Sequence, residues 1–256
     1  MNPAEISVLV ITCNEDANIR RFLEGMAWAG QILVVDSGST DATQAICLEF
    51  PQVRVVHRVF DSFADQCNFG LGLLDTPWVL SCDADYIAEP DFAKAVRLLD
   101  GAVDGYSVPF IYCIHGKKIR SGLYPARVVL YRREAGCYYN DGHGHKVKLS
   151  GKVLPFPGRL LHDDRKPLAR WLGSQGNYAA QEASKIMSVD PNKLPFQDKL
   201  RRTGWAAPMG MLFYCLIFKG GLLDGWPGIF YAMQRTYAEI LLSLEILEWR
   251  FNRTLN

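Results

Sequence analysis

The sequence carries almost no net charge, and this excludes one class of partner. Its 28 lysine and arginine residues nearly balance 27 aspartate and glutamate residues, so that the formal charge of the 256-residue chain is +1. Proteins that bind nucleic acid through a broad surface carry a clear excess of basic residues. We therefore expect no nucleic-acid partner, and any basic patch on this protein must be local.

The cysteines show no pattern that would indicate a metal site or a redox motif. None of the seven forms a CxxC pair, and several lie inside apolar stretches, where a reduced cysteine behaves as a small hydrophobic residue. Cys137 with His143 and His145 fits no common structural zinc pattern. The N-terminus lacks a charged-then-apolar export signal, and we therefore expect a cytoplasmic protein.

Long hydrophobic runs are also missing. Residues 203–218 contain no charged residue and residues 220–234 only Asp224, but a membrane-spanning helix needs about 20 apolar residues. A cationic flank before an aromatic-rich apolar helix favours a peripheral contact with anionic lipid on the cytoplasmic face of the inner membrane. Packing of these helices on the rest of the chain, or in a homodimer, is the alternative. The flanking cations are Lys199, Arg201 and Arg202.

The first hundred residues alternate strands with helices. Apolar runs predict strands at residues 6–12, 31–36, 53–57 and 78–82, and helical spacing or a capping residue marks a helix after each of the first three. Short connections between alternating strands and helices predict an α/β fold with a doubly wound, mainly parallel sheet. In such sheets, ligands bind beyond the carboxyl ends of the strands.

The pattern changes after residue 105. Strands are expected at 108–112, at 127–131 and near Val153, with a Gly/His-rich loop between the last two, and helices follow from Pro167. The turn-forming residues at 188–195 make this stretch the best candidate linker. We therefore expect a domain at 1–187, with halves 1–104 and 105–187, and a helical region at 188–256, whose last helix exposes Glu239, Glu245 and Glu248.

Two aspartates, Asp83 and Asp85, directly follow the fourth predicted strand. Residues i and i+2 at the end of a strand point the same way. Two neighbouring carboxylates repel each other unless a cation lies between them. Such a site suits Mg²⁺ or Mn²⁺, completed by phosphate oxygens and water. A solvated acidic loop is the alternative, but the position beyond a buried strand favours a metal site.

Asp36 ends the second predicted strand and is followed by Ser37-Gly38-Ser39-Thr40-Asp41. A carboxylate at this position can accept a hydrogen bond from the N–H of a base or from a ribose hydroxyl. Thr40 and Asp41 are expected to cap the next helix, whose N-terminus favours anions. Because the cap is supplied downstream, Asp36 itself is predicted to bind a ligand.

Four motifs follow one another over residues 6–90. They are Ile6-Ser-Val-Leu-Val-Ile-Thr-Cys-Asn-Glu15, Val34-Val-Asp36-Ser-Gly-Ser-Thr-Asp41, Phe63-Ala-Asp-Gln66-Cys-Asn68 and Leu80-Ser-Cys-Asp83-Ala-Asp85. Together they resemble glycosyltransferase family 2, in particular the bacterial lipopolysaccharide-core and lipid-linked glycan transferases. The resemblance implies a GT-A fold with a helical C-terminal extension. It also implies a nucleoside-diphosphate sugar as donor, UDP-linked, and a divalent cation, Mg²⁺ or Mn²⁺.

The same resemblance implies roles for individual residues. Asp83 reaches the ribose or the metal, Asp85 binds the metal that bridges the diphosphate, and His162 joins them as a late histidine ligand. Arg165 and Lys166 suit the diphosphate, although a polar surface turn is the alternative for this segment. Cys13 departs from the family, which usually has an aromatic residue there. The remaining residues predicted to bind the nucleotide sugar are Thr12, Cys13, Asn14, Glu15, Asp36, Gln66 and Asn68.

The acceptor side departs from the family at one position. Close relatives place a carboxylate base in a His-Glu pair after an arginine-containing strand, whereas the pair here reads His145-Lys146. Lysine cannot act as a carboxylate base at neutral pH without a large pKa shift. Asp141 is the nearest replacement, and His145 is the second choice because a neutral imidazole accepts protons.

Two functions follow as hypotheses. The first is an inverting transfer of a sugar to a hydroxyl of a lipopolysaccharide-core or lipid-linked glycan acceptor. The alternative is a non-catalytic nucleotide-sugar-binding scaffold at the membrane, and Lys146 is the residue that favours it.

Overall fold

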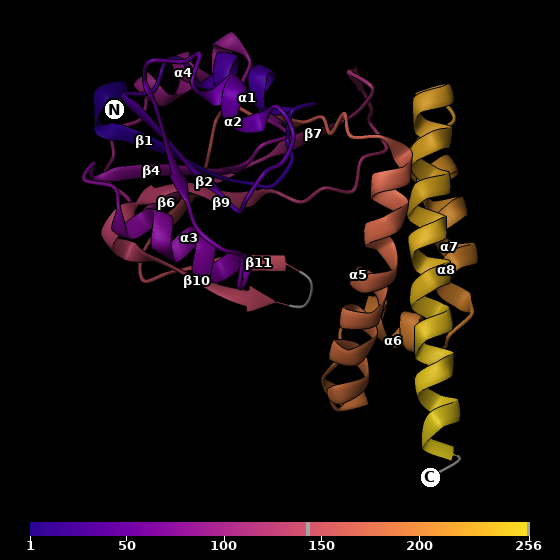
Figure 1. Cartoon of the computed structure of the whole chain (residues 1–256). Coiled ribbons are helices and arrows are strands. Elements are labelled where there is room, and N and C mark those ends of the chain that lie inside the picture. Colours follow the sequence, from indigo (N-terminus) through magenta and orange to yellow (C-terminus); the bar gives the residue numbers. More distant parts are fainter. Residues whose placement is uncertain (142–143, 255–256) are drawn as a thin grey trace. The chain divides into compact units, whose positions relative to one another are not determined.

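The computed structural model describes residues 1–141 and 144–254 (Figure 1). His143 of the predicted Gly/His-rich loop therefore lies outside the described residues. The chain divides into two compact units. Residues 1–115 and 123–166 form the first, called the α/β unit here, and residues 116–122 with 167 onward form the second, called the helical unit.

A seven-stranded sheet in the order β12-β6-β9-β4-β1-β2-β3 forms the centre of the α/β unit. β3, β2, β1 and β4 run parallel to one another, as predicted, while β9 runs antiparallel between β4 and β6. The parallel strands are buried on both faces, which explains their continuous apolar sequence. The bounds are β1 (Ile6–Thr12), β2 (Gln31–Asp36), β3 (Val53–His57), β4 (Trp78–Asp83), β6 (Gly105–Val108), β9 (Arg127–Arg132) and β12 (Val153–Pro155).

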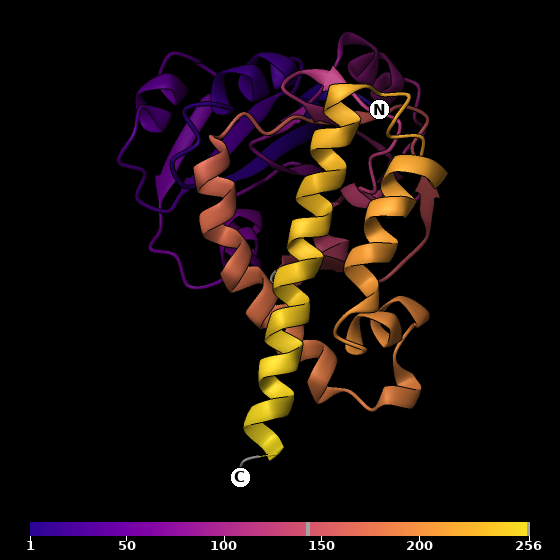
Figure 2. The same cartoon turned by 90° about the vertical axis from the view of Figure 1, so that its right-hand side faces the viewer.

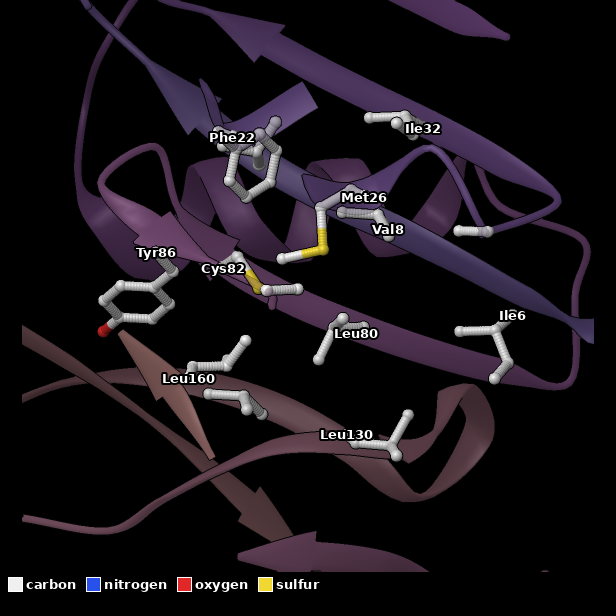
Figure 3. Close-up of a cluster of buried hydrophobic side chains, with 14 of the residues drawn as sticks. Ile6, Val8, Phe22, Met26, Ile32, Leu80, Cys82, Tyr86, Leu130 and Leu160 are labelled. Carbon is white, nitrogen blue, oxygen red and sulfur yellow. The ribbon is translucent and has the colours of Figure 1, made fainter. Parts of the chain in front are cut away.

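Helices cover both faces of this sheet (Figure 1). On one face, Phe22 and Met26 of α1 pack against Val8, Ile32 and Leu80 of the strands, and Figure 3 shows this buried cluster. On the other face, α3 packs over β1 and β2. Burial of apolar surface on both faces provides most of the stability of such a sheet. The helices are α1 (Ile19–Met26), α2 (Thr43–Cys47), α3 (Phe63–Gly72) and α4 (Pro90–Arg97), with short 3₁₀ turns at Pro3–Glu5 and Arg133–Ala135.

The second half of the α/β unit differs from the sequence prediction in two places. Pro109 divides the expected strand 108–112 into β6 and β7 (Phe110–Ile114), because proline has no N–H for a ladder. The expected Gly/His-rich loop is instead an antiparallel hairpin of β10 (Gly136–Asp141) and β11 (Gly144–Leu149). A further small sheet pairs β13 (Leu160–His162) with β5 (Tyr86–Ile87) and β7.

In the helical unit, α5 and α7 each pack along the long helix α8 (Figure 2). Ala183 and Ile186 of α5 are buried with Leu242 and Ile246 of α8. Because α5 packs on α8, the chain passes from the α/β unit to the helical unit near residue 167, whereas the sequence predicted a boundary at 187–188. The elements are β8 (Lys117–Lys118), α5 (Leu168–Ser188), η3 (Pro191–Lys193), α6 (Phe196–Arg202), α7 (Ala206–Phe213), the π-helical turn η4 (Tyr214–Phe218) and α8 (Trp226–Thr254).

Among the described residues, none of the helices combines the length and the apolar composition that crossing a bilayer requires.

One charged contact inside the helical unit corrects the sequence interpretation. Glu239 was expected on the exposed side of α8, but it is only 2% exposed. Its carboxylate accepts hydrogen bonds from the guanidinium of Arg201, the shortest at 2.6 Å, and Arg235 lies 4.0 Å away. Arg201 also contacts Asp198 at 3.2 Å. Arg201 is therefore engaged inside the unit, and its expected role as a lipid-facing cation is wrong.

Replacing Glu239 should test how much this pair stabilises the helical unit. Glu239→Ala leaves the guanidinium of Arg201 without its buried carboxylate, and breaking one side of such a pair typically costs about 3–5 kcal/mol of unfolding free energy. Denaturant unfolding followed by circular dichroism measures the loss. Glu248→Ala, at an exposed position of the same helix, is the control and should change the free energy by less than about 0.5 kcal/mol. Similar effects of the two variants would show that the pair does not hold α6 on α8.

Candidate functional site

The loops after β1 and β2 are hydrogen-bonded to each other. The Thr12 hydroxyl donates to Asp36 at 3.0 Å, and the backbone N–H of Asn14 donates to the Ser39 hydroxyl at 2.8 Å. In return, the side-chain oxygen of Asn14 accepts from the backbone N–H of Thr40 at 2.7 Å. Asn14 has a positive φ of 56°, a conformation that asparagine tolerates better than most residues. The two loops therefore form one structure at the carboxyl edge of the sheet.

Asp36 organises this structure and is completely buried. Its carboxylate accepts from the backbone N–H groups of Gly38 at 3.0 Å and Ser39 at 2.9 Å, and from the Gln44 amide at 2.7 Å. Burial opposes the charged form, but these hydrogen bonds outweigh it and lower the pKa of Asp36. Its backbone donors lie in the loop before α2, whereas the N–H of Thr43, at the start of that helix, donates to Asp41 at 2.9 Å. A nucleoside contact of Asp36 would have to replace one of these donors.

Glu15, in the loop after β1, forms an ion pair with Lys166, the last residue of the α/β unit. The Lys166 ammonium lies 2.8 Å from the Glu15 carboxylate, and both side chains are mostly buried. Burial raises the pKa of Glu15 more than Lys166 lowers it. For Lys166, burial opposes the charge, but Glu15 and Asp164 outweigh it and raise the pKa. The structure thus brings together two of the predicted nucleotide-binding residues.

The segment 162–166 is held on α1 by a network of polar side chains. Arg21 and Arg165 each contact the buried Asp163 at 2.8 Å. The Asn18 amide donates to Asp164 at 2.8 Å. Arg165 and Lys166 are therefore matched by carboxylates of this chain, and their position is fixed. Cys13 lies exposed on the loop after β1.

Asp85 and His162, two of the three residues predicted to bind a metal, are in direct contact. The His162 Nε2 lies 3.0 Å from Asp85 Oδ2, and the two side chains are 15% and 13% exposed. Asp85 Oδ1 and His162 Nδ1 are both buried and have no hydrogen-bond partner among the described residues. Burial disfavours the imidazolium, but Asp85 and Asp83 outweigh it and raise the pKa of His162. An unsatisfied buried carboxylate oxygen is costly, and a cation would satisfy it.

Asp83 is more open than Asp85, because its side chain is 37% exposed. It lies 3.8 Å from the Arg127 guanidinium. Among the described residues, no group of three His, Cys, Asp or Glu side chains is arranged to hold a metal. Mg²⁺ usually binds through one or two carboxylates with substrate phosphates and water, so such a group is not required here.

A pocket of about 260 Å³ opens beside Asp83. It lies between the ends of β4 and β9 and the hairpin β10–β11, and its polar lining includes Arg127, His145 and Lys146. Arg127 donates to the hydroxyls of Tyr86 at 3.0 Å and Tyr124 at 2.8 Å. Neither tyrosine was predicted to belong to the site, because two lone aromatic residues carry no motif.

The two candidate bases differ in their surroundings. Asp141 is ion-paired with Lys146 across the hairpin, and it is not among the residues that line the pocket. His145 lines the pocket and stacks on Phe63 with a ring separation of 5.7 Å. Burial and the nearby Arg127 lower the pKa of His145. Its imidazole is therefore neutral at neutral pH and able to accept a proton.

Gln66 and Asn68 of α3 have structural partners. The Gln66 amide donates to the backbone oxygens of Arg58 and Val59, each at 3.1 Å. Asn68 exchanges two hydrogen bonds with the backbone of Tyr138, at 3.0 and 2.9 Å. These side chains hold the loop after β3 and strand β10 in place around the site.

Curated proteins similar to this chain are glycosyltransferases. A lipopolysaccharide core biosynthesis glycosyltransferase of Rhizobium meliloti is 31% identical over 84 residues, which are 31% of each chain. An uncharacterized glycosyltransferase of Rickettsia bellii is 35% identical over 82 residues, 32% of this chain and 28% of the relative. The chain thus matches less than a third of the length of these relatives.

The fold also occurs in a solved structure. Glucosyl-3-phosphoglycerate synthase from Mycobacterium tuberculosis, in complex with phosphoglyceric acid, superposes with a TM-score of 0.51 at 19% identity. The match covers 71% of this chain and 80% of that one. At this identity the likeness concerns the fold alone, and it confirms the GT-A fold with its mainly parallel sheet.

The family follows from a longer match. Residues 7–144, more than half of the chain, fit the sequence model of Glycosyl transferase family 2. This range runs from the second residue of β1 through β10 and includes the loops after β1 and β2 and Asp83 with Asp85. The chain therefore belongs to glycosyltransferase family 2.

Proposed function

We propose that this protein transfers a sugar from a nucleoside-diphosphate sugar, UDP-linked, to a hydroxyl of a lipopolysaccharide-core or lipid-linked glycan acceptor. The observation that carries the proposal is the position of Asp83. It stands between the Asp85–His162 contact and a pocket of about 260 Å³, within a family 2 glycosyltransferase domain. A donor bound at the loops after β1 and β2 would present its sugar to that pocket.

A divalent cation, Mg²⁺ or Mn²⁺, fits the residues at the end of β4. Asp85 offers a buried carboxylate oxygen without a partner among the described residues, and Asp83 offers an exposed carboxylate two residues earlier. We propose that Asp83 and Asp85 hold the cation and that His162, through its hydrogen bond, orients Asp85 or joins it as a ligand. When bound, the cation neutralises charge on the departing diphosphate.

The donor site would be completed by the loops and the segment 162–166. Thr12, Cys13, Asn14 and Asp36 shape the surface on which the nucleoside would lie. Lys166 is fixed by Glu15, and Arg165 by Asp163, so both cations are oriented before a ligand arrives. Preorganised cations stabilise a diphosphate without the cost of ordering long side chains.

The acceptor hydroxyl needs a base, and the pocket supports His145. A neutral imidazole that lines the pocket can take the proton as the hydroxyl attacks the anomeric carbon. Attack opposite the departing diphosphate in a single step inverts the configuration of that carbon. Asp141 is the second choice here, because it is ion-paired with Lys146 and is not among the residues that line the pocket.

Exposed apolar side chains of the helical unit support a peripheral contact of the protein with the cytoplasmic face of the inner membrane. Trp205, Met209, Phe213 and Ile217 follow one another at intervals of four residues and are all exposed. A soluble surface rarely carries so many large apolar side chains without an interaction partner. A lipid-linked acceptor lies at the bilayer surface, and a homodimer through these helices is the alternative use of the same side chains.

One observation favours a second candidate, a non-catalytic nucleotide-sugar-binding scaffold. Lys146 stands where close relatives carry the catalytic glutamate, and it neutralises Asp141. A scaffold would bind UDP-sugars without turning them over. Measurement of UDP release from a panel of UDP-sugars, with and without a glycolipid extract, separates the two candidates.

The metal proposal is tested at Asp85. Asp85→Ala removes the buried carboxylate, so UDP should no longer raise the melting temperature more with Mn²⁺ than without it, and sugar transfer should be lost. Asp91→Ala, which removes an exposed carboxylate from α4, is the matched control and should behave like the wild type. Unchanged Mn²⁺-dependent stabilisation in Asp85→Ala would place the cation elsewhere.

The base is tested by comparing His145→Gln with Asp141→Asn. Loss of a general base typically lowers the rate by about 10²–10⁴-fold, and His145→Gln should show this loss with UDP binding unchanged. In the wild type, kcat/KM should be constant at neutral pH and fall as the pH drops through the pKa of His145, which lies below its ordinary 6.5. A larger loss in Asp141→Asn, with an unchanged pH profile in His145→Gln, would make Asp141 the base.

A further inference from the structure

The inserted segment, residues 116–122, leaves the α/β unit between β7 and β9 and belongs to the helical unit. One carboxylate oxygen of Asp224 holds it. This oxygen accepts from the backbone N–H groups of Arg120 at 2.8 Å and Ser121 at 2.9 Å, and from the Ser121 hydroxyl at 2.9 Å. Ser121 is completely buried. Three donors on one carboxylate fix this segment beside the turn that leads into α8.

Exposed cations and apolar side chains surround this turn. The Lys117 ammonium lies 5.2 Å from the centre of the Trp226 ring, and the Lys219 ammonium lies 5.8 Å from that of Tyr214. Phe218 and Leu223 are both 79% exposed. Aromatic rings next to ammonium groups, with aliphatic side chains beyond them, are typical of a protein surface at the headgroup level of a bilayer.

The acidic residues of this region face inward. Between residues 195 and 240 the sequence contains three acids, Asp198, Asp224 and Glu239. Asp198 and Glu239 contact Arg201, and Asp224 holds the inserted segment. Lys117, Arg120 and Lys219 are exposed. The surface is therefore cationic, which attracts an anionic partner and disfavours a symmetric dimer, because that contact would bring like charges together.

We propose that Lys117, Arg120, Phe218, Lys219, Leu223 and Trp226 form a docking surface for an anionic lipid bilayer. The inference deepens the membrane contact of the proposed function and rests on it. It assigns the lipid contact to the inserted segment and the turn before α8, in place of the flank at Lys199, Arg201 and Arg202. Along the chain, the inserted segment ends two residues before Tyr124, whose hydroxyl accepts a hydrogen bond from the pocket residue Arg127.

The experiment measures co-sedimentation of the full chain with vesicles of phosphatidylcholine, with and without phosphatidylglycerol. The variant Lys117→Gln/Arg120→Gln/Lys219→Gln should weaken binding to the anionic vesicles by about fivefold for each charge, on the order of a hundredfold in total. Binding to pure phosphatidylcholine should be weak for every protein. The matched control is Arg97→Gln/Lys148→Gln/Lys152→Gln, which removes three exposed cations from the α/β unit and should retain most of the affinity.

A second variant distinguishes vesicle binding that depends on the anchored inserted segment from attraction by net charge alone. Asp224→Ala removes an acid, so attraction by net charge alone predicts tighter vesicle binding. Loss of the anchor of the inserted segment predicts weaker binding, and this is the expected result. Asp224→Asn keeps an acceptor oxygen for the three donors and should bind at least as tightly as the wild type. Tighter binding of Asp224→Ala, or equal losses in the two triple variants, would overturn the proposal.

The vesicle assay needs no turnover, and the two proposals can therefore fail separately. A wild type that binds anionic vesicles but releases no UDP from any UDP-sugar would contradict the proposed transfer and leave the docking surface standing. A wild type that transfers sugar but ignores anionic vesicles, and sediments as a dimer, would contradict the docking surface alone.

Discussion

The parallel register of β1 with its two neighbours is the constraint on which the site depends. Thr12 pairs with Asp36 in β2, and Ile11 pairs with Asp83 in β4. Three strands thus end at one level, and each polar residue appears where its strand stops. A slip of one residue in either pairing would turn the side chains to the opposite face. The apolar positions on both faces of these strands exclude such a slip, so that packing of the core also determines the geometry of the site.

The same principle brings in a residue from the far end of the domain. β13 runs antiparallel to β5, with His162 opposite Tyr86, and the backbone N–H of Asp163 donates to the backbone oxygen of Asp85 at 2.9 Å. Since β5 begins just after Asp85, this pairing places the His162 ring against the Asp85 carboxylate. The segment that follows carries Arg165 and Lys166, and it can reach the loop after β1 only because β13 ends there. Backbone pairing of β13 and the side-chain contacts of the segment 162–166 together assemble the candidate donor site.

The sequence predicted those parts of the structure that depend on local patterns. Apolar runs predicted β1 to β4. Asp36, Asp83 and Asp85 were singled out because they stand at or just after the ends of these runs, and both signals can be recognised from neighbouring residues alone. Contacts between distant residues were not predictable in this way. The engagement of Asp36 by Gln44, the burial of Glu239 by Arg201 and the tyrosines around Arg127 arise from packing of separate elements. A hairpin hidden in a Gly/His-rich stretch was also missed, because glycine and histidine give weak strand signals.

The two units are not consecutive along the chain, and this has a consequence for function. The chain passes from one unit to the other near residues 116, 122 and 167, so that the helical unit is tied into the middle of the glycosyltransferase domain. A truncation after residue 187, at the boundary expected from the sequence, would remove Asp224 and leave the buried Ser121 without its acceptor. Tyr124 and Arg127 follow within a few residues. The helical unit therefore anchors Arg120 and Ser121, which precede Pro125, Ala126 and Arg127 of the pocket lining by only a few residues along the chain.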